Sequence, residues 1–282
     1  MLTVRSFKAD WKESDLDWIP GETFSCYALN VAHLVLPPGE LWFCRLFNLA
    51  LPHIKDENLR TQVKGFIGQE GAHARGHRDA LNAYEANGWD FTESKQRLNG
   101  IFNHLLGEKA FGRYELSGEQ ELRWLRFRLA IVAAVEHVTC VLGTWIINNT
   151  ALEALGANRQ MLDLLQWHGA EEVEHRTVAH DVYEAVGGSS LLRMLIFIPV
   201  MFFILLTWKR GTQVFIKQDK SGPAKYGFKA YRRAAKRGCL PSLGLLSKAF
   251  LRYFSWRYHP RNEGSTELAV QTLNRLEAGR VQ

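Results

Sequence analysis

The sequence has few of the features that mark stapled, secreted or nucleotide-binding proteins. Its four cysteines (Cys26, Cys44, Cys140 and Cys239) are scattered without a Cys-x-x-Cys pair, which argues against a zinc ribbon and a disulfide framework. No glycine-rich phosphate loop follows a strand-like run, so nucleotide binding has no support. The first residues lack the apolar core of a secretory signal. We therefore expect a cytoplasmic protein in a reducing compartment.

The chain does contain enough apolar material for a large core. Hydrophobic residues make up 46% of the 282 residues, and there are only eight prolines, so extensive disorder is not expected. The charge is unevenly spread, because residues 209–237 hold ten basic residues and one acidic residue. The net charge of that segment is +9. Because the net charge of the whole chain is +6, the remaining residues sum to −3. It has no recognisable nucleic-acid-binding module, and we expect no nucleic-acid partner.

Long apolar and periodic runs predict an all-α protein. Residues 1–37 contain Pro20-Gly21 and Pro37-Pro38-Gly39 and are expected to form an irregular arm. The expected long helices span about residues 40–52, 56–86, 118–149 and 158–186, with one short helix between residues 89 and 117. A short amphipathic helix is expected near the end, at TELAVQTLNRLEAG. Four long helices with modest connections predict a four-helix bundle.

Two of the expected helices carry the same internal motif, a Glu followed three positions later by a His. These pairs are Glu70 with His73 and Glu172 with His175. Positions i and i+3 lie about 60° apart on one helix face, so each helix can aim both side chains at one point. A preceding helix supplies a lone Glu in each case, Glu40 for the first motif and Glu136 for the second. Four helices with this order of residues could bind two metal ions between them.

The chemistry of these side chains indicates which metals to expect. Four carboxylates can bridge two cations and offset their charge, and one imidazole per metal helps to fix the geometry of each site. Such a set suits iron or manganese better than zinc, which usually takes fewer carboxylates. We expect two iron ions, with manganese as an alternative and zinc if the protein is a hydrolase. Glu136 is the most informative of these residues, because its neighbours in VAAVEHVTCVLG are almost all apolar.

The pattern resembles the ferritin-like di-iron carboxylate superfamily. The stretches PPGELWF, FIGQEGAHARGH, AVEHVT and AEEVEHR also resemble a bacterial family labelled predicted metal-dependent hydrolase, over most of residues 25–190. The resemblance implies a ferritin-like bundle and the following metal ligands: Glu40, Glu70, His73, Glu136, Glu172 and His175. It further implies that Glu171, which directly precedes the second motif, orients His175. Gln69 holds the equivalent place before the first motif but is neutral, which puts the same role there in doubt.

Further histidines lie close to the motifs. His77 and His168 each fall within about 40° of a proposed ligand on the same helix face. Each could be an additional ligand, a proton relay beside the metals, or a buried imidazole bonded to a nearby carboxylate. We assign both to the catalytic machinery, together with Glu171. His137, His33 and His180 are interpreted as structural.

Residues 194–208 form an uncharged apolar run that directly precedes the basic segment. We therefore expect residues 1–188 to form the metal-binding bundle and residues 189–282 a helical extension, apolar and then basic. As a helix the run spans about 22 Å, short of a bilayer core of roughly 30 Å. A monotopic anchor on the cytoplasmic face of the membrane, a single span, and a buried helix or homodimer contact are all open.

The sequence supports three functions. The favoured hypothesis is an oxidoreductase in which a di-iron centre activates O₂ to oxidise a small hydrophobic or lipid-like substrate, with a separate electron donor. It rests on the expected apolar surroundings of the centre, from Ile131, Val132, Val135, Val138 and Val141. The first alternative is a metal-dependent hydrolase in which the metals activate water. The second is a non-catalytic metal-binding protein.

Overall fold

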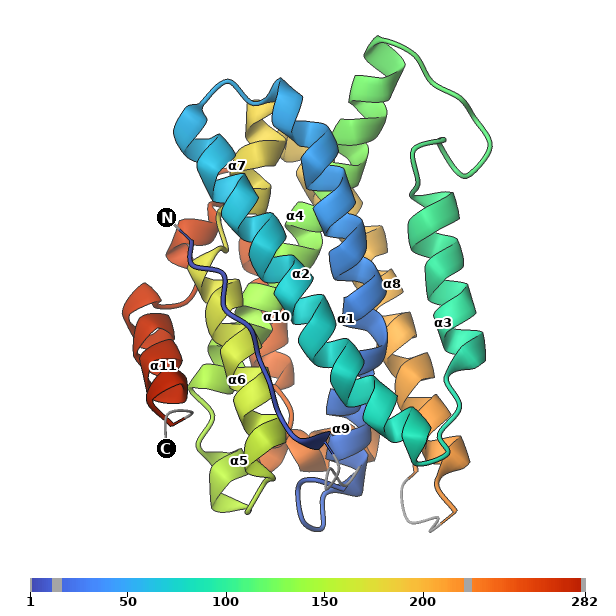
Figure 1. Cartoon of the computed structure of the whole chain (residues 1–282), viewed down its shortest axis with the longest axis vertical. Coiled ribbons are helices and arrows are strands. Elements are labelled where there is room, and N and C mark those ends of the chain that lie inside the picture. Colours follow the sequence, from blue (N-terminus) through green and yellow to red (C-terminus); the bar gives the residue numbers. More distant parts are fainter. Residues whose placement is uncertain (1, 12–16, 221–224, 280–282) are drawn as a thin grey trace.

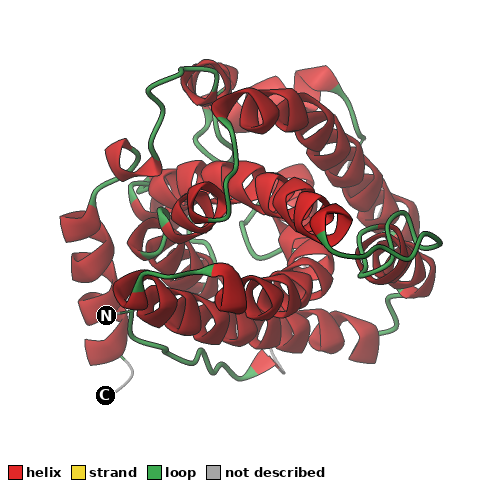
Figure 2. Cartoon of the chain, turned by 90° about the horizontal axis from the view of Figure 1, so that it is seen from above, coloured by secondary structure: helices red, strands yellow, loops and turns green. Residues whose placement is uncertain are grey.

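The structure is a computed structural model that describes residues 2–11, 17–220 and 225–279. Within these ranges the chain is helical, and its one β-type contact is an isolated bridge between Ala110 and Tyr114. Figure 1 shows long helices running side by side, and Figure 2 shows the same helices and loops from above. The all-α bundle predicted from the sequence is therefore confirmed.

Four helical segments hold the residues singled out above. They are α1 (Thr23–Ala50), α2 (Glu57–Ala86), α4 (Glu119–Ile147) and α6 (Arg159–Glu174). Helix α1 packs extensively on α2, and α4 packs extensively on α6. The other helices are α3 (Thr92–Asn99), α5 (Ala151–Ala154), α7 (Val178–Ala185), α8 (Ser190–Gln218), α9 (Phe228–Lys236), α10 (Leu243–Tyr253) and α11 (Thr266–Ala278), with short turns at Leu51–His53, Gly100–Leu105 and Pro260–Asn262.

The predicted irregular arm through residue 37 is wrong beyond residue 22, because α1 begins at Thr23 and continues through Pro37 and Pro38. A proline inside a helix removes a hydrogen bond and costs about 3 kcal/mol. Here the helix is buried along much of its length, with Val31 and Phe47 fully inaccessible. Packing of this kind outweighs the local penalty.

The second and third expected helices are confirmed almost to the residue. The side chain of Asp56 accepts hydrogen bonds from the backbone N–H groups of Asn58 and Leu59, which caps α2 at its N-terminus. The fourth expected helix is divided in two, because α6 ends at Glu174 and α7 begins at Val178. His175 is the C-cap residue of α6, and its N–H still bonds the Glu171 carbonyl at 3.0 Å. Glu172 and His175 therefore remain on one helical turn.

Helix α8 contains the apolar run of the sequence. One face is buried against α1 and α4 and includes Met194 and Phe197. The opposite face is exposed at five large apolar side chains spaced by three or four residues: Leu191, Leu195, Ile198, Phe202 and Leu205. By length and composition α4 and α8 could each cross a bilayer; 56% of the α4 window but only 28% of the α8 window is buried within the protein. Helix α4 is thus a core helix, whereas α8 keeps an apolar face toward the outside.

The N-terminal residues lie as an extended segment across the bundle, beside α2 and α6 (Figure 1). Two glycines of α2 make room for it. A Cβ on Gly65 would lie 2.8 Å from the Leu2 side chain, and one on Gly68 would lie 2.4 Å from Val4. The segment ends in Phe7, whose ring lies 5.7 Å from that of Trp167. These contacts hold residues 2–7 against α2 and α6, the two helices that carry the Glu-x-x-His motifs.

Candidate metal centre

The structure brings the six predicted ligands together in the core of the bundle. Glu40 comes from α1, the first motif from α2, Glu136 from α4, and the second motif from the end of α6. Each of these side chains is at most 3% exposed. Candidate ligand atoms lie within 4.8 Å of one another in two groups: Glu40, His73 and His168, and Glu70, Glu172 and His175. Glu136 joins the second group, since its Oε2 lies 3.3 Å from His175 Nε2.

Many polar atoms of this cluster have no hydrogen-bond partner in the described part of the chain. They are both carboxylate oxygens of Glu40, Glu70 and Glu136, Oε2 of Glu172, Nδ1 of His73 and Nε2 of His175. Leaving a buried carboxylate unpaired costs several kcal/mol, which proteins avoid unless the charge is paired or bound to a metal. The donor set therefore fits metal ions, and its two geometric groups fit two of them.

The same cluster shows the electrostatic strain that cations would relieve. Burial, together with the neighbouring carboxylate of Glu70, raises the pKa of Glu40 well above its usual value. Burial and the charge of Glu172 raise the pKa of Glu136 to about 8. Burial alone would lower the pKa of His175, but Glu172 and Glu136 outweigh it and raise that pKa well above its usual value. Divalent cations would compensate this concentration of negative charge in place of protons.

A carboxylate orients the histidine of the first motif, not that of the second. Glu171 Oε2 accepts from His73 Nε2 at 2.9 Å, and Glu171 Oε1 lies 3.0 Å from the Arg5 guanidinium. The expectation that Glu171 orients His175 is therefore wrong. The partners cross between the motifs: Glu171, before the second motif, contacts His73 of the first, and Gln69, before the first motif, contacts His175 of the second. With its proton at Nε2, His73 directs its Nδ1 lone pair into the cluster.

Gln69 performs the same task for His175, and the sequence analysis left this role in doubt. Its amide nitrogen donates to the Thr3 carbonyl at 2.9 Å and to Glu174 Oε2 at 2.7 Å. Its oxygen is thereby left to accept from His175 Nδ1 at 3.0 Å. Nε2 is then the nitrogen of His175 that faces the carboxylates and could bind a metal. A neutral amide can orient a histidine as well as a carboxylate does, provided other acceptors fix the orientation of the amide.

The remaining histidines separate into two sets. His168 and His77 lie at the centre: His168 Nε2 is 2.8 Å from Glu172 Oε1, and its Nδ1 is 2.6 Å from His77 Nε2. His33 continues the line from His77, although the sequence analysis interpreted it as structural. His137 instead contacts the Ala249 carbonyl and the Tyr258 hydroxyl, and His180 lies 3.3 Å from Glu184. These two face the C-terminal extension rather than the cluster.

Arg5 also reaches the site, although its aperiodic surroundings in the sequence give no signal of this. Arg5 bonds Glu171 and Glu174 at 3.0 Å each. The expected apolar lining from α4 is only partly present. Val132 and Val141 are buried, but Ile131, Val135 and Val138 pack with Phe197 and Tyr253 of α8 and α10. Helix α4 therefore contributes less of the apolar lining than expected.

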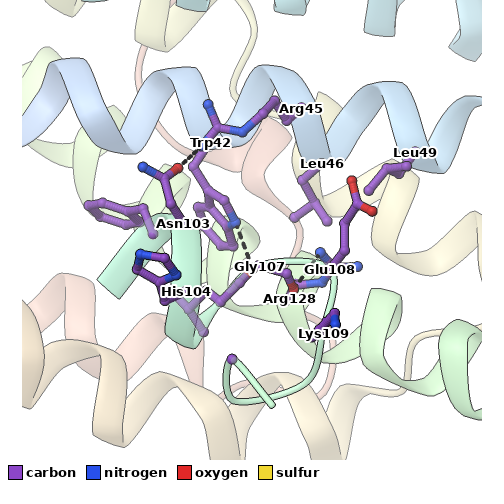
Figure 3. Close-up of a pocket in the computed structure, with 13 residues that line it drawn as sticks. Trp42, Arg45, Leu46, Leu49, Asn103, His104, Gly107, Glu108, Lys109 and Arg128 are labelled. Atoms are coloured by element: carbon purple, nitrogen blue, oxygen red, sulfur yellow. Dashed lines mark hydrogen bonds between the residues drawn. The ribbon is translucent and has the colours of Figure 1, made fainter. Parts of the chain in front are cut away.

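An open pocket of about 340 Å³ lies along α1 (Figure 3). Its apolar wall includes Trp42, Leu46 and Phe102, and its cationic wall includes Arg45 and Arg128. Figure 3 shows Arg45 bonded to Asn103, at 2.6 Å. At about 100° per residue, Trp42 and Leu46 lie about 200° and 240° around α1 from Glu40, so the pocket opens on the face of this helix opposite the first ligand.

The fold and the site together define an all-helical, metal-dependent protein. Residues 3–264 match the model of a family described as predicted metal-dependent hydrolase, and the chain belongs to that family. No curated protein and no solved structure matches the chain. The family description supports the hydrolytic alternative above the favoured oxidoreductase hypothesis. The ferritin-like relationship rests on the ligand pattern and stays a prediction.

Proposed function

We propose that the protein is a hydrolase that uses a two-metal centre held by Glu40, Glu70, His73, Glu136, Glu172 and His175. The observation that carries the proposal is the set of unpartnered oxygen and nitrogen atoms that these buried side chains direct at one another. The family description supports the reaction class. Two cations bound there would act as Lewis acids that lower the pKa of water and polarise the carbonyl or phosphoryl group of a substrate.

The protein residues supply orientation and enclosure. Glu171 and Gln69 each accept a hydrogen bond from the nitrogen of His73 or His175 that faces away from the cluster, which leaves the other nitrogen of each ring to bind a metal. Aromatic rings cover the same two imidazoles, because Trp167 lies edge-on to His73 at 5.0 Å and Phe66 edge-on to His175 at 4.8 Å between centroids. This enclosure limits the access of solvent to the ligands and strengthens the electrostatic interactions among them.

The pocket on the face of α1 opposite Glu40 supports a substrate whose remote part has an apolar portion and an anionic group. Arg128 is only 6% exposed and donates to the Gly107 carbonyl, while its Nε has no partner in the described chain. Burial lowers the pKa of Arg128 to about 10, so the guanidinium is charged at neutral pH. A carboxylate or phosphate group would pair with this charge, and Trp42 and Phe102 would contact the apolar portion. An anionic lipid-like ester fits this description.

The exposed face of α8 supports a location at an anionic membrane surface. Its five apolar side chains are solvent-exposed, and all ten basic residues of the segment 209–237 are exposed as well. An apolar strip with a neighbouring cluster of exposed cations is complementary to a bilayer with anionic headgroups. Binding to lipid vesicles distinguishes a membrane from a second copy of the chain as the partner of this face.

The second candidate function is oxidation by O₂ at a di-iron centre. Its support is the ligand set itself, two Glu-x-x-His motifs and two further glutamates from separate helices, since carboxylate-rich sites of this kind suit iron. A separate electron donor would then be required.

One set of measurements tests these proposals. The purified protein should hold about two transition-metal ions per chain, and Glu136→Gln should lose at least one. Glu121→Gln is the matched control, because Glu121 is exposed on the same helix. Zinc- or manganese-loaded protein should cleave ester or phosphoester substrates, and Glu136→Gln should not. Absence of metal from the wild type would refute the centre. Oxygen consumption by the ferrous form, without hydrolysis by any metal form, would establish the second candidate instead.

A further inference from the structure

Three buried histidines form a continuous line from the metal centre into the core. His33 Nδ1 lies 2.8 Å from His77 Nδ1, and His77 Nε2 lies 2.6 Å from His168 Nδ1. At the outer end, His33 Nε2 is 3.2 Å from the sulfur of Met161. At the inner end, His168 Nε2 is 2.8 Å from Glu172 Oε1. The three imidazoles, at most 5% exposed, come from α1, α2 and α6 and thus connect three helices.

The number of protons in this line does not match the number of contacts. A neutral imidazole carries one N–H, so three neutral histidines supply three protons, whereas the line contains four close contacts. A fourth proton would give one of these buried imidazoles a full charge. Burial opposes this at the outer end of the line, where it lowers the pKa of His33 to about 3. One contact in the line therefore has no proton.

The two ends differ in how they can accommodate the missing proton. A thioether sulfur carries no proton and can only accept, so a proton-free contact between Met161 and His33 would place two lone pairs against each other. Nothing at that end could relieve the repulsion, because the described surroundings of Met161 are buried core. At the other end, His168 Nε2 without a proton and Glu172 Oε1 lie 2.8 Å apart, and both could bind the same cation. Glu40 Oε1 lies 3.7 Å from the same nitrogen.

We infer that His168 is a further metal ligand through Nε2, and that His77, His33 and Met161 fix the tautomer that makes it one. Every N–H of the line then points away from the metals: His168 donates to His77, His77 donates to His33, and His33 donates to the Met161 sulfur. The inference rests on the proposed two-metal centre. His33 and His77 are then positioning residues, and the Met161 sulfur is the hydrogen-bond acceptor at the far end of the line.

The inference predicts an unusual effect of a conservative substitution. In Met161→Leu the terminal acceptor is gone, and three contacts remain for three protons. All three contacts are then satisfied when each N–H points toward the metal centre. This arrangement puts an N–H on His168 Nε2, which opposes metal binding. We expect the affinity for one metal ion to fall by roughly 10- to 100-fold, the usual range for losing a partner that orients a ligand. Exchange of Met for Leu conserves volume, so the variant should fold.

Met194→Leu is the matched control, since Met194 is 8% exposed in α8 and distant in sequence from the line. Metal affinity is measured by chelator competition with Co²⁺ or Zn²⁺, using the full-length protein. If Met161→Leu binds both ions as tightly as Met194→Leu does, the tautomer argument is refuted.

A spectroscopic measurement tests the ligand assignment without any variant. Imidazoles bound to Co²⁺ give hyperfine-shifted, exchangeable N–H signals in the proton NMR spectrum, one for each ligand histidine. The inference requires signals from three histidines, His73, His168 and His175, and His168→Ala should remove one of them. Two signals from a wild type that binds two cobalt ions would refute the inference but leave the centre intact. A wild type that binds no metal would instead refute the proposed function.

Discussion

A close approach between two ligand-bearing helices gives a quantitative test of how tightly the centre is held. Helices α4 and α6 meet at Gly143 and Gly169, where a Cβ on Gly143 would lie 2.4 Å from the Gly169 carbonyl oxygen. An ordinary carbon–oxygen contact is about 3.3 Å, so Gly143→Ala must separate the helices by about 1 Å. The obstacle is backbone, which cannot rotate away. A gap of that size forfeits roughly a quarter to a half of the dispersion energy between the surfaces that separate.

Two opposing terms set the expected change in stability. Alanine is favoured over glycine inside a helix by about 1 kcal/mol, whereas overpacking costs about 1–3 kcal/mol. Because the contact lies between two helix backbones, we take the upper value and expect a net loss of about 2 kcal/mol. Metal binding should weaken as well, because α4 carries Glu136 and α6 carries Glu172, and a binding site tolerates displacements of only about 0.5 Å.

Gly71→Ala is the matched control. Gly71 is also in a helix, α2, but a Cβ there would meet only the end of the Arg75 side chain, at 3.6 Å. This variant should gain about 0.4–1 kcal/mol through helix propensity and keep its metals. Urea denaturation of the metal-free proteins gives the free energies of unfolding, and metal analysis gives the content. If Gly143→Ala is as stable and as well loaded as Gly71→Ala, the close packing of α4 on α6 is not what holds the ligands in place.

Four other substitutions probe separate parts of the protein. The pKa of His180 is lowered by burial to about 3, so below pH 6.5 the unfolded chain binds a proton that the folded chain rejects; His180→Gln should reduce the loss of unfolding free energy between pH 6 and 4 by up to about 1.4 kcal/mol per pH unit. Phe202→Ser should weaken binding to anionic vesicles by about tenfold or more, and high salt should weaken wild-type binding without abolishing it; equal vesicle binding by variant and wild type would contradict the proposed membrane face. Arg5→Met should lower metal affinity by about tenfold, because Glu171 loses the cation that holds it against His73; chelator competition measures this affinity. Arg128→Met should raise KM for anionic substrates and leave kcat nearly unchanged, and an unchanged KM would argue against the pocket.

The helices that could be predicted from the sequence are those with strong local signals. Helix α4 is long and apolar, and α2 has Asp56 as its cap. Helix α1 was predicted too short because Pro37-Pro38 is a strong local stop signal, and only the tertiary burial of the surrounding residues overrides it. The break between α6 and α7 could not be predicted, because no proline or glycine marks it in the sequence.

The candidate ligands could be predicted because helical periodicity converts spacing into direction. Glu70 and His73 share a face whatever the rest of the fold does. No spacing rule predicts which side chains of two different helices contact each other, and so Glu171 was paired with the wrong histidine. The role of His33 is beyond the sequence for the same reason, because its neighbours His77 and Met161 are 44 and 128 residues away.

The N-terminal arm has a consequence for how the protein is made. Arg5 bonds Glu171, beside the metal centre, and also Glu277 of α11, 272 residues away in the chain. During synthesis residue 5 leaves the ribosome 272 residues before residue 277. The complete set of contacts that holds Arg5 beside Glu171 can therefore form only after α11 has emerged. Until then the nascent protein carries glutamates and histidines for metals that it is not yet able to hold firmly.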